Sequence, residues 1–209
     1  MKVLLINGSP KKNGCTYTAL EEVAAEIKKQ GIETEIFHIG NDPIRGCTGC
    51  GYCGKTGNHQ CVFTNDVVNE AILKAKECDG FIFGTPVHYA AASGGITSFL
   101  DRMFYAASGS FALKPGAAVA SCRRGGSSTA LDQLNKYFTI ANMPVVSSQY
   151  WNMVHGNTPD EVKQDLEGMQ TLRVLGRNMA WLLKSIEAGK KAGVELPERE
   201  ARARTNFIR

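Results

Sequence analysis

The amino-acid sequence predicts an α/β fold: a doubly wound, five-stranded parallel sheet with helices on both faces. Short apolar runs rich in β-branched residues alternate with helical patterns, which is typical of a parallel sheet because each crossover passes through a helix. A length of 209 residues with 43% hydrophobic content suits one well-buried domain. We expect this domain to cover residues 1–190, followed by a basic tail over 191–209.

The expected strands are Val3 to Asn7, Glu35 to Ile39, Gly80 to Gly84, Ala117 to Ser121 and Pro144 to Ser148. A capping box over 18–21 is expected to open the first helix, and Gly31 to end it. Further helices are expected over 66–76, 96–105 and 129–140. A last helix, with Thr158 as its N-cap, is expected to run toward Ile186, to close one side of the sheet and to serve a homo-oligomer interface.

The composition argues against several classes of function. The net charge of +4 is modest and comes partly from the arginine-rich tail, so we expect no nucleic-acid partner. No stretch approaches the roughly 20 apolar residues of a membrane span, so we expect no membrane partner. Seven cysteines, most of them clustered, do not suit a secreted disulfide framework. A cytoplasmic protein is the expectation.

Four cysteines form the most informative pattern of the chain. Cys47, Cys50, Cys53 and Cys61 follow a C-x2-C-x2-C-x7-C spacing within a long irregular segment, residues 40–65. The first three have the spacing that bacterial ferredoxins use around a four-iron, four-sulfur (4Fe-4S) cluster. A loop of this length inside a compact α/β domain usually carries function. A cluster, a zinc ion, a disulfide and free thiols remain open readings of this pattern.

A second pattern follows the first strand, where residues 9–18 contain hydroxyl side chains and a flexible Asn13-Gly14 pair. The start of a helix favours a phosphate, although a plain turn also explains this loop. Residues 84–89 and 121–126 follow two other strands in the same way. Carboxyl ends of parallel strands are where ligands bind in doubly wound sheets. The three loops therefore predict one ligand site.

These loops and the cysteines together resemble a known family. Over residues 1–155 the chain resembles the NADPH-dependent FMN reductase branch of the flavodoxin-like superfamily, and its cysteines resemble those of iron-sulfur flavoproteins. The motifs that carry the resemblance are Asn7-Gly8-Ser9-Pro10, the cysteine run, Gly84-Thr85-Pro86-Val87-His88-Tyr89 and Ser98-Phe99-Leu100-Asp101-Arg102. The resemblance implies a flavodoxin-like sheet of order 2-1-3-4-5, bound FMN, NAD(P)H as cosubstrate and a homodimer or homotetramer.

The resemblance also implies roles for particular residues. The FMN phosphate is expected to bind Ser9, Lys11, Asn13, Thr16, Tyr17 and Thr18. The flavin ring is expected to lie against Thr85, Pro86, Val87, His88 and Tyr89 on one side and Ser121, Arg123, Arg124, Gly125 and Gly126 on the other. Metal binding would fall to Cys47, Cys50, Cys53 and Cys61.

Plainer roles remain open for some of these side chains. His88 could be a loop histidine without a chemical role, and Tyr89 could be ordinary aromatic packing. Arg123 and Arg124 could be solvated, or one of them could meet the phosphate of NADPH.

The leading functional hypothesis is an FMN-dependent NAD(P)H oxidoreductase that passes electrons to a quinone, a flavin, a nitro or azo compound, or a ferric or iron-sulfur acceptor. The alternative is a non-enzymatic iron-sulfur flavoprotein that carries electrons from ferredoxin. A thiol switch at the four cysteines is a third reading. No catalytic acid, base or nucleophile is expected, because the sequence holds no recognisable triad or H-E-x-x-H motif.

Overall fold

The computed structural model describes residues 1–198, 200–201, 203 and 205–206. Its parallel sheet contains β1 (Lys2–Asn7), β2 (Glu33–His38), β3 (Gly80–His88), β5 (Gly116–Cys122) and β6 (Met153–His155). Their order, β2-β1-β3-β5-β6, is the expected order 2-1-3-4-5. The added strand β4 (Ala91–Ala92) lies off this path and pairs antiparallel with the end of β3.

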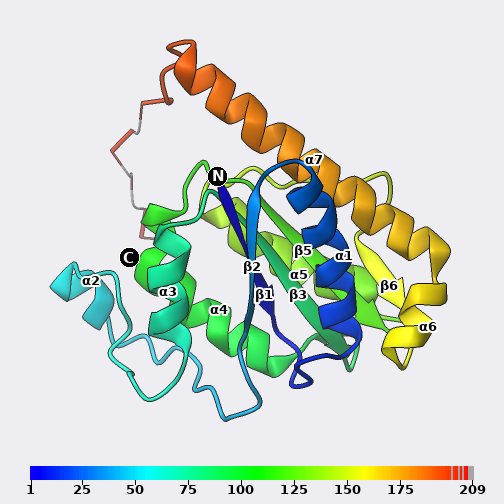
Figure 1. Cartoon of the computed structure of the whole chain (residues 1–209). Helices are drawn as coiled ribbons and strands as arrows, with labels where there is room; N and C mark the ends of the chain where they lie inside the picture. The colour runs from blue at the N-terminus through cyan, green and yellow to red at the C-terminus, as the bar shows by residue number, and fades with distance from the viewer. Residues whose placement is uncertain (199, 202, 204, 207–209) are drawn as a thin grey trace.

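Helices cover both faces of the sheet (Figure 1). One face carries α1 (Cys15–Lys29), α6 (Pro159–Gln164) and α7 (Leu166–Lys191). The other carries α3 (Val68–Lys76), α4 (Gly94–Ala107) and α5 (Ser127–Ile140). The single-turn helices α2 (Tyr52–Thr56) and η1 (Ser108–Ser110) belong to the connections between larger elements.

Burial on both faces explains why the central strands read as continuous apolar runs. In β1, Val3 and Leu5 pack into the core beneath α1 and α7, whereas Leu4 and Ile6 pack into the core beneath α3 and α4. Successive side chains of a strand point to opposite faces, so a strand covered on both sides is apolar throughout. The α/β prediction is confirmed.

The expected fifth strand was placed wrongly. Residues 144–148 make a single bridge, between Val145 and Gly116, and the strand beside β5 is β6, five residues further on. Pro144 has no N–H for a ladder, although its carbonyl accepts a hydrogen bond from Gly116. The strand β6 has only three residues, too few to produce a periodic pattern.

The predicted start of the first helix was also wrong. α1 begins at Cys15 behind the N-cap Gly14, which has no side chain to cap the helix. Thr18 therefore lies one turn inside the helix, where its hydroxyl donates to the Gly14 carbonyl at 3.2 Å. The expected end is confirmed, since Gly31 follows α1 with φ +77°.

The last helix is divided in two. Thr158 is confirmed as an N-cap, because its hydroxyl accepts the Glu161 N–H at 3.2 Å. The chain then breaks at Asp165, whose carboxylate accepts the Gly168 N–H at 2.9 Å and so caps α7. The expected role of this helix at a homo-oligomer interface stays a prediction.

The arginines that would make the expected tail basic, Arg199, Arg202, Arg204 and Arg209, lie outside the described residues. Among the residues that are described, no helix combines the length and apolar character needed to cross a membrane.

Candidate functional site

The loop after β1 and the carboxyl ends of β3 and β5 meet at one edge of the sheet and line an open cavity of about 200 Å³. Residues 156–157, which follow β6, complete its wall. All of these segments lie at or directly after the carboxyl ends of parallel strands, which is where we expected the ligand from the sequence. Segments up to about 150 positions apart in the sequence thus form one site.

The loop after β1 is held in place by its own side chains. Asn7, which is fully buried, donates to the Lys12 carbonyl at 3.0 Å and accepts the Ser9 N–H at 3.1 Å. The Ser9 hydroxyl accepts the Lys11 N–H at 3.1 Å, and His38 Nε2 lies 2.8 Å from the Ser9 carbonyl. These bonds fix the loop before any ligand arrives.

The first turn of α1 has the properties of an anion site. Its N-cap Gly14 offers no side chain, and the turn contains no acidic residue, so its backbone N–H groups lack a side-chain partner. Thr16 lines the cavity, and its hydroxyl lies 2.8 Å from that of Ser121 at the end of β5. Both hydroxyl groups belong to buried residues, so this contact joins the first turn of α1 to the end of β5.

The loop after β3 is a tight hairpin with a strained tip. Tyr89 and Ala90 have φ values of 49° and 60°, which are unusual for residues with a Cβ. Thr85 is fully buried, and its hydroxyl donates to the Pro86 carbonyl and accepts the Ser93 N–H. Tyr89 is fully exposed, with a relative exposure of 105%, so ordinary aromatic packing within the chain does not account for it.

The loop after β5 needs a glycine at its end. Gly126 has φ +90°, and a Cβ there would lie 2.5 Å from the Cα of Ala90. A Cβ on Gly125 would meet nothing within 4 Å. Only Gly126 therefore lets the loops after β3 and β5 approach one another closely.

The cavity brings together half of the residues that were expected to bind FMN. Those that line it are Ser9, Lys11, Thr16, Pro86, Val87, His88, Ser121 and Arg123. Those outside its lining are Asn13, Tyr17, Thr18, Thr85, Tyr89, Arg124, Gly125 and Gly126. Thr18 and Thr85 instead hold the backbone of α1 and of the β3 loop, while Tyr17 donates to Glu21 at 3.3 Å.

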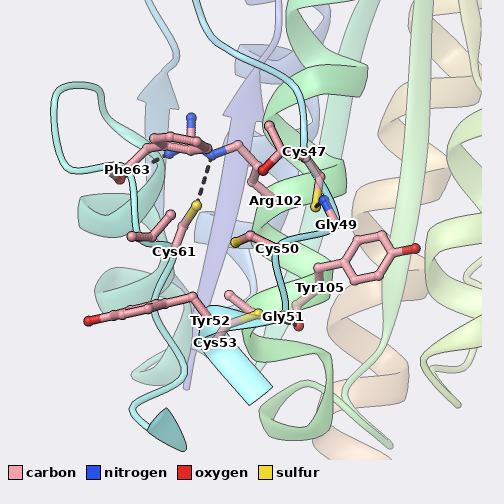
Figure 2. Close-up of a pocket in the computed structure, with 13 residues that line it drawn as sticks. Cys47, Gly49, Cys50, Gly51, Tyr52, Cys53, Cys61, Phe63, Arg102 and Tyr105 are labelled. Carbon is pink, nitrogen blue, oxygen red and sulfur yellow. Dashed lines mark hydrogen bonds between the residues drawn. The ribbon is translucent and has the colours of Figure 1, made fainter. Parts of the chain in front are cut away.

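The four cysteines of residues 40–65 line a second cavity, of about 100 Å³, between their loop and α4 (Figure 2). Gly49 and Gly51, with φ of 66° and 70°, turn the backbone between these cysteines. The Gly49 N–H lies 3.5 Å from the sulfur of Cys47, within hydrogen-bonding range for sulfur. Backbone N–H groups near thiolates are a common feature of iron-sulfur sites.

Two side chains from other elements hold Cys61 in this cavity. Arg102 of α4 donates through Nε to the sulfur of Cys61 at 3.1 Å, as Figure 2 shows. Asn69 of α3 pairs with both backbone polar groups of Cys61. The fourth cysteine, separated from Cys53 by seven residues, is thereby fixed beside the other three.

Arg102 is buried and fully engaged. Its guanidinium forms an ion pair with Asp66 and donates to the carbonyls of Arg45 and Phe63. Burial acts to lower the pKa of Arg102, but the hydrogen bonds to Asp66 and Cys61 raise it above its ordinary value. The cavity therefore borders a permanent positive charge.

Four thiols are the donor set of the cysteine cavity. Within the described residues, no group of three or more His, Cys, Asp or Glu side chains is close enough to bind one ion. The four cysteines instead surround a cavity, and all of them are free thiols. A tetrahedral zinc site would need the four sulfurs at about 2.3 Å from one point. Four thiols around an open space suit a 4Fe-4S cluster.

Comparison with protein-family models shows which family this chain belongs to. The family model described as NADPH-dependent FMN reductase matches residues 1–158. This chain belongs to that family. The match contains all three loops of the larger cavity and all four cysteines of the smaller one.

A curated relative is similar to this chain over most of its length, and two solved structures share its fold. The iron-sulfur flavoprotein MJ1083 of Methanocaldococcus jannaschii is 35% identical over 90% of this chain and 100% of its own length. The structure of a flavodoxin from the domain Archaea covers 88% of this chain and 99% of its own, with TM-score 0.60 and 15% identity. The apo form of the NADH:FMN oxidoreductase EMOB covers 87% and 89%, with TM-score 0.64 and 18% identity. The two structures share the flavodoxin-like fold with this chain.

Several residues around the two cavities were not among the individual site residues that we predicted, although three of them, Pro10, Cys15 and Cys122, lie within the predicted loops. Pro10, Cys15, Cys122, Gly156 and Asn157 line the larger cavity, and Asn7 and His38 support its first loop. Asn69 and Arg102 hold Cys61. Asn7 and Arg102 stood within motifs that carried the resemblance, so a signal existed for them. His38 was part of an expected strand, and nothing in its sequence context indicated a contact with Ser9.

Proposed function

We propose that this protein is an FMN-dependent NAD(P)H oxidoreductase, which passes electrons from a nicotinamide through FMN to an acceptor. The observation that carries the proposal is the meeting of three strand-end loops around one cavity beside an uncapped helix start. A quinone, a free flavin, a nitro or azo compound, a ferric chelate and an iron-sulfur centre are acceptors of suitable chemistry.

The FMN phosphate would bind at the start of α1. Backbone N–H groups of the first turn, the hydroxyls of Ser9 and Thr16, and the ammonium of Lys11 are the donors that line this part of the cavity. The helix dipole adds a favourable field for an anion. The hydrogen bonds of Asn7 would keep the loop in the binding conformation.

The flavin ring would bind against the carboxyl ends of β3 and β5. Pro86, Val87 and His88 of β3 and residues 121–123 at the end of β5 line this part of the cavity side by side, because Pro86 and Ser121 are partners in the sheet. When bound, FMN supplies the redox chemistry, since its ring accepts electrons from a nicotinamide and releases them to other acceptors. The chain would bind and orient the partners, and we propose that Arg123, which lines the cavity, meets the phosphate of NADPH.

We also propose that Cys47, Cys50, Cys53 and Cys61 bind a 4Fe-4S cluster. The support is the cavity that these four side chains line, together with the iron-sulfur flavoprotein relative. Free thiols in this number suit a reducing compartment, in line with the expected cytoplasmic location.

A homodimer or homotetramer would complete the flavin site. The larger cavity, about 200 Å³, is smaller than the roughly 300–1,000 Å³ of a typical ligand pocket. Tyr89 projects fully exposed from the loop that forms one wall. Both observations are expected if a second copy of the chain covers part of the flavin.

A second candidate function is a non-enzymatic carrier that receives electrons from ferredoxin. It is favoured by the openness of the cysteine cavity, because Cys50 is exposed and the other three cysteines are partly exposed. An electron-transfer partner could therefore approach the proposed cluster directly.

Anaerobic kinetics with the FMN-loaded protein separate the two functions. We expect NADPH or NADH to be oxidised in the steady state with a simple quinone as acceptor. No turnover with either nucleotide, alongside reduction of the protein by reduced ferredoxin, would overturn the enzyme proposal and support the carrier. Free FMN at the same concentration is the control for non-enzymatic oxidation.

A further inference from the structure

We propose that Arg102 sets the reduction potential of the cluster through its hydrogen bond to Cys61 and its positive charge. The inference rests on the proposed 4Fe-4S centre and adds a residue that is not a ligand. Arg102 acts through Cys61, so it is a positioning and tuning residue. The hydrogen bond from Nε to the cysteine sulfur, 3.1 Å long, carries the argument.

The orientation of this guanidinium is fixed by its other partners. One terminal nitrogen donates to the Arg45 carbonyl at 3.3 Å and pairs with Asp66, and the other donates to the Phe63 carbonyl at 3.0 Å. The side chain has no exposed surface. Because the fork of an arginine is planar and rigid, these contacts leave Nε directed at the sulfur of Cys61.

The position of this charge is electrostatically significant. Among the described residues that line the cysteine cavity, Arg102 is the only one with a permanent charge. Burying a guanidinium is costly unless it is paired, and its one carboxylate partner, Asp66, lies on the side of the terminal nitrogens. The guanidinium of Arg45 lies over the ring of Phe63, 5.1 Å from its centre. The Nε side of Arg102 therefore faces sulfur.

A donor and a positive charge at a ligand sulfur favour the more negative, reduced form of a cluster. Hydrogen bonds to the sulfurs and nearby charge are among the factors that set the potential of an iron-sulfur centre. The presence of Arg102 should thus raise the potential. The opposite charge of Asp66 should partly offset that effect.

A purely structural role for Arg102 predicts a different result. If it only held the loop, its replacement would reduce cluster content while the remaining clusters kept their potential. Replacing Asp66 would then also act on cluster content alone. A tuning role requires shifts of opposite sign for the two members of the ion pair.

The test is redox titration of anaerobically purified protein, followed by visible absorption. Arg102→Gln removes the charge and Arg102→Lys keeps it, whereas Asp66→Asn removes the opposing charge together with one of two acceptor oxygens. One oxygen of Asp66 accepts the Val68 N–H at 3.1 Å and the other accepts from Arg102, so the asparagine variant keeps one of these two acceptors. We expect the potential to fall in Arg102→Gln, to fall less in Arg102→Lys, and to rise in Asp66→Asn.

An unchanged potential in Arg102→Gln or in Asp66→Asn would overturn the inference, as would shifts of the same sign. If the arginine variants fail to fold, the reduction potential of Asp66→Asn still decides between a tuning role and a purely structural one. A further measurement uses unaltered protein labelled with nitrogen-15 arginine, whose reduced cluster should show a nitrogen-15 hyperfine coupling. Absence of that coupling contradicts the hydrogen bond.

A separate measurement shows whether the proposed 4Fe-4S cluster is present at all. Iron and acid-labile sulfide are measured first in the unaltered protein, because their absence would remove the cluster itself. With iron and sulfide present, the potentials report on Arg102 alone.

Discussion

The side-chain amide of Asn69 pairs with both backbone polar groups of Cys61. Its oxygen accepts the Cys61 N–H at 2.8 Å, and its nitrogen donates to the Cys61 carbonyl at 2.9 Å. The same nitrogen lies 3.1 Å from the Phe63 carbonyl. One residue at the start of α3 therefore fixes the backbone on which the fourth proposed ligand stands.

Replacing this amide should release the fourth ligand. We expect Asn69→Leu, which removes three hydrogen bonds, to lower the iron content while leaving FMN bound, because the flavin cavity shares no residue with this contact. Iron and flavin are measured in the same anaerobic preparation. The matched control is Glu70→Gln, at the next, exposed position of α3. Full iron content in Asn69→Leu would contradict the assigned role.

A second prediction concerns the contact between the loops of the flavin cavity. Gly126→Ala should weaken FMN binding, because the new Cβ would meet the backbone of Ala90 and because φ +90° strains any residue with a Cβ. A left-handed conformation alone costs about 1–2 kcal/mol. Fluorescence titration of the apoprotein with FMN measures the change.

Gly125→Ala provides the control for this experiment, since its Cβ would enter open space. We expect it to bind FMN nearly as the unaltered protein does. Equal effects of the two substitutions would show that the close approach of the loops is not what FMN binding requires.

A third prediction concerns the buried hydroxyl pair of Thr16 and Ser121, 2.8 Å apart. Thr16→Val leaves the Ser121 hydroxyl without its partner, which typically costs about 1–3 kcal/mol. Replacing Ser121 by alanine as well removes the hydroxyl that lost its partner. The double variant Thr16→Val, Ser121→Ala should therefore be more stable than Thr16→Val alone. Urea unfolding of the apoprotein measures these differences. Strictly additive effects would mean that the two hydroxyls do not interact.

A fourth prediction concerns pH and the packing of α1 on α7. Hydrogen bonds from Lys29 and then Arg177 hold the pKa of Glu26 below its ordinary value of 4.5. A lowered pKa in the folded state means that the stabilisation is fully present above 4.5 and disappears as pH falls through the lowered value. We expect Glu26→Gln to be less stable than the unaltered protein near neutral pH.

That difference should shrink as the solution is acidified. Denaturant unfolding at a series of pH values, from about 7 to about 3, follows it. A difference that stays constant over this range would mean that the Glu26 pKa is not lowered by folding.

The sheet could be predicted from the sequence because its central strands are buried on both faces. Val3 to Asn7 and Gly80 to Gly84 are apolar runs that lie at the centre of the observed sheet. The edge strand β6 escaped prediction because three residues cannot show a period. Val145, within an apolar run at the expected position, forms only one bridge.

The candidate sites were predictable where they lie in local motifs. The spacing of the cysteines indicated that their side chains could surround one centre, and the structure brings all four to one cavity, while the metal itself stays a prediction. Asn69 and Arg102 act on Cys61 from 8 and 41 positions away, so no local pattern could assign these contacts. The prediction that Thr18 caps the first helix was wrong because the helix begins earlier, at Cys15. Its N-cap is Gly14, which has no side chain to cap the helix.

The central claim is that the cavity between the three strand-end loops binds FMN. The most direct test is titration of the apoprotein with FMN, followed by quenching of flavin fluorescence. We predict equimolar binding at micromolar protein, and weaker binding when Lys11, which lines the phosphate end, is replaced in Lys11→Ala. A folded protein that leaves the fluorescence of micromolar FMN unchanged would contradict the account.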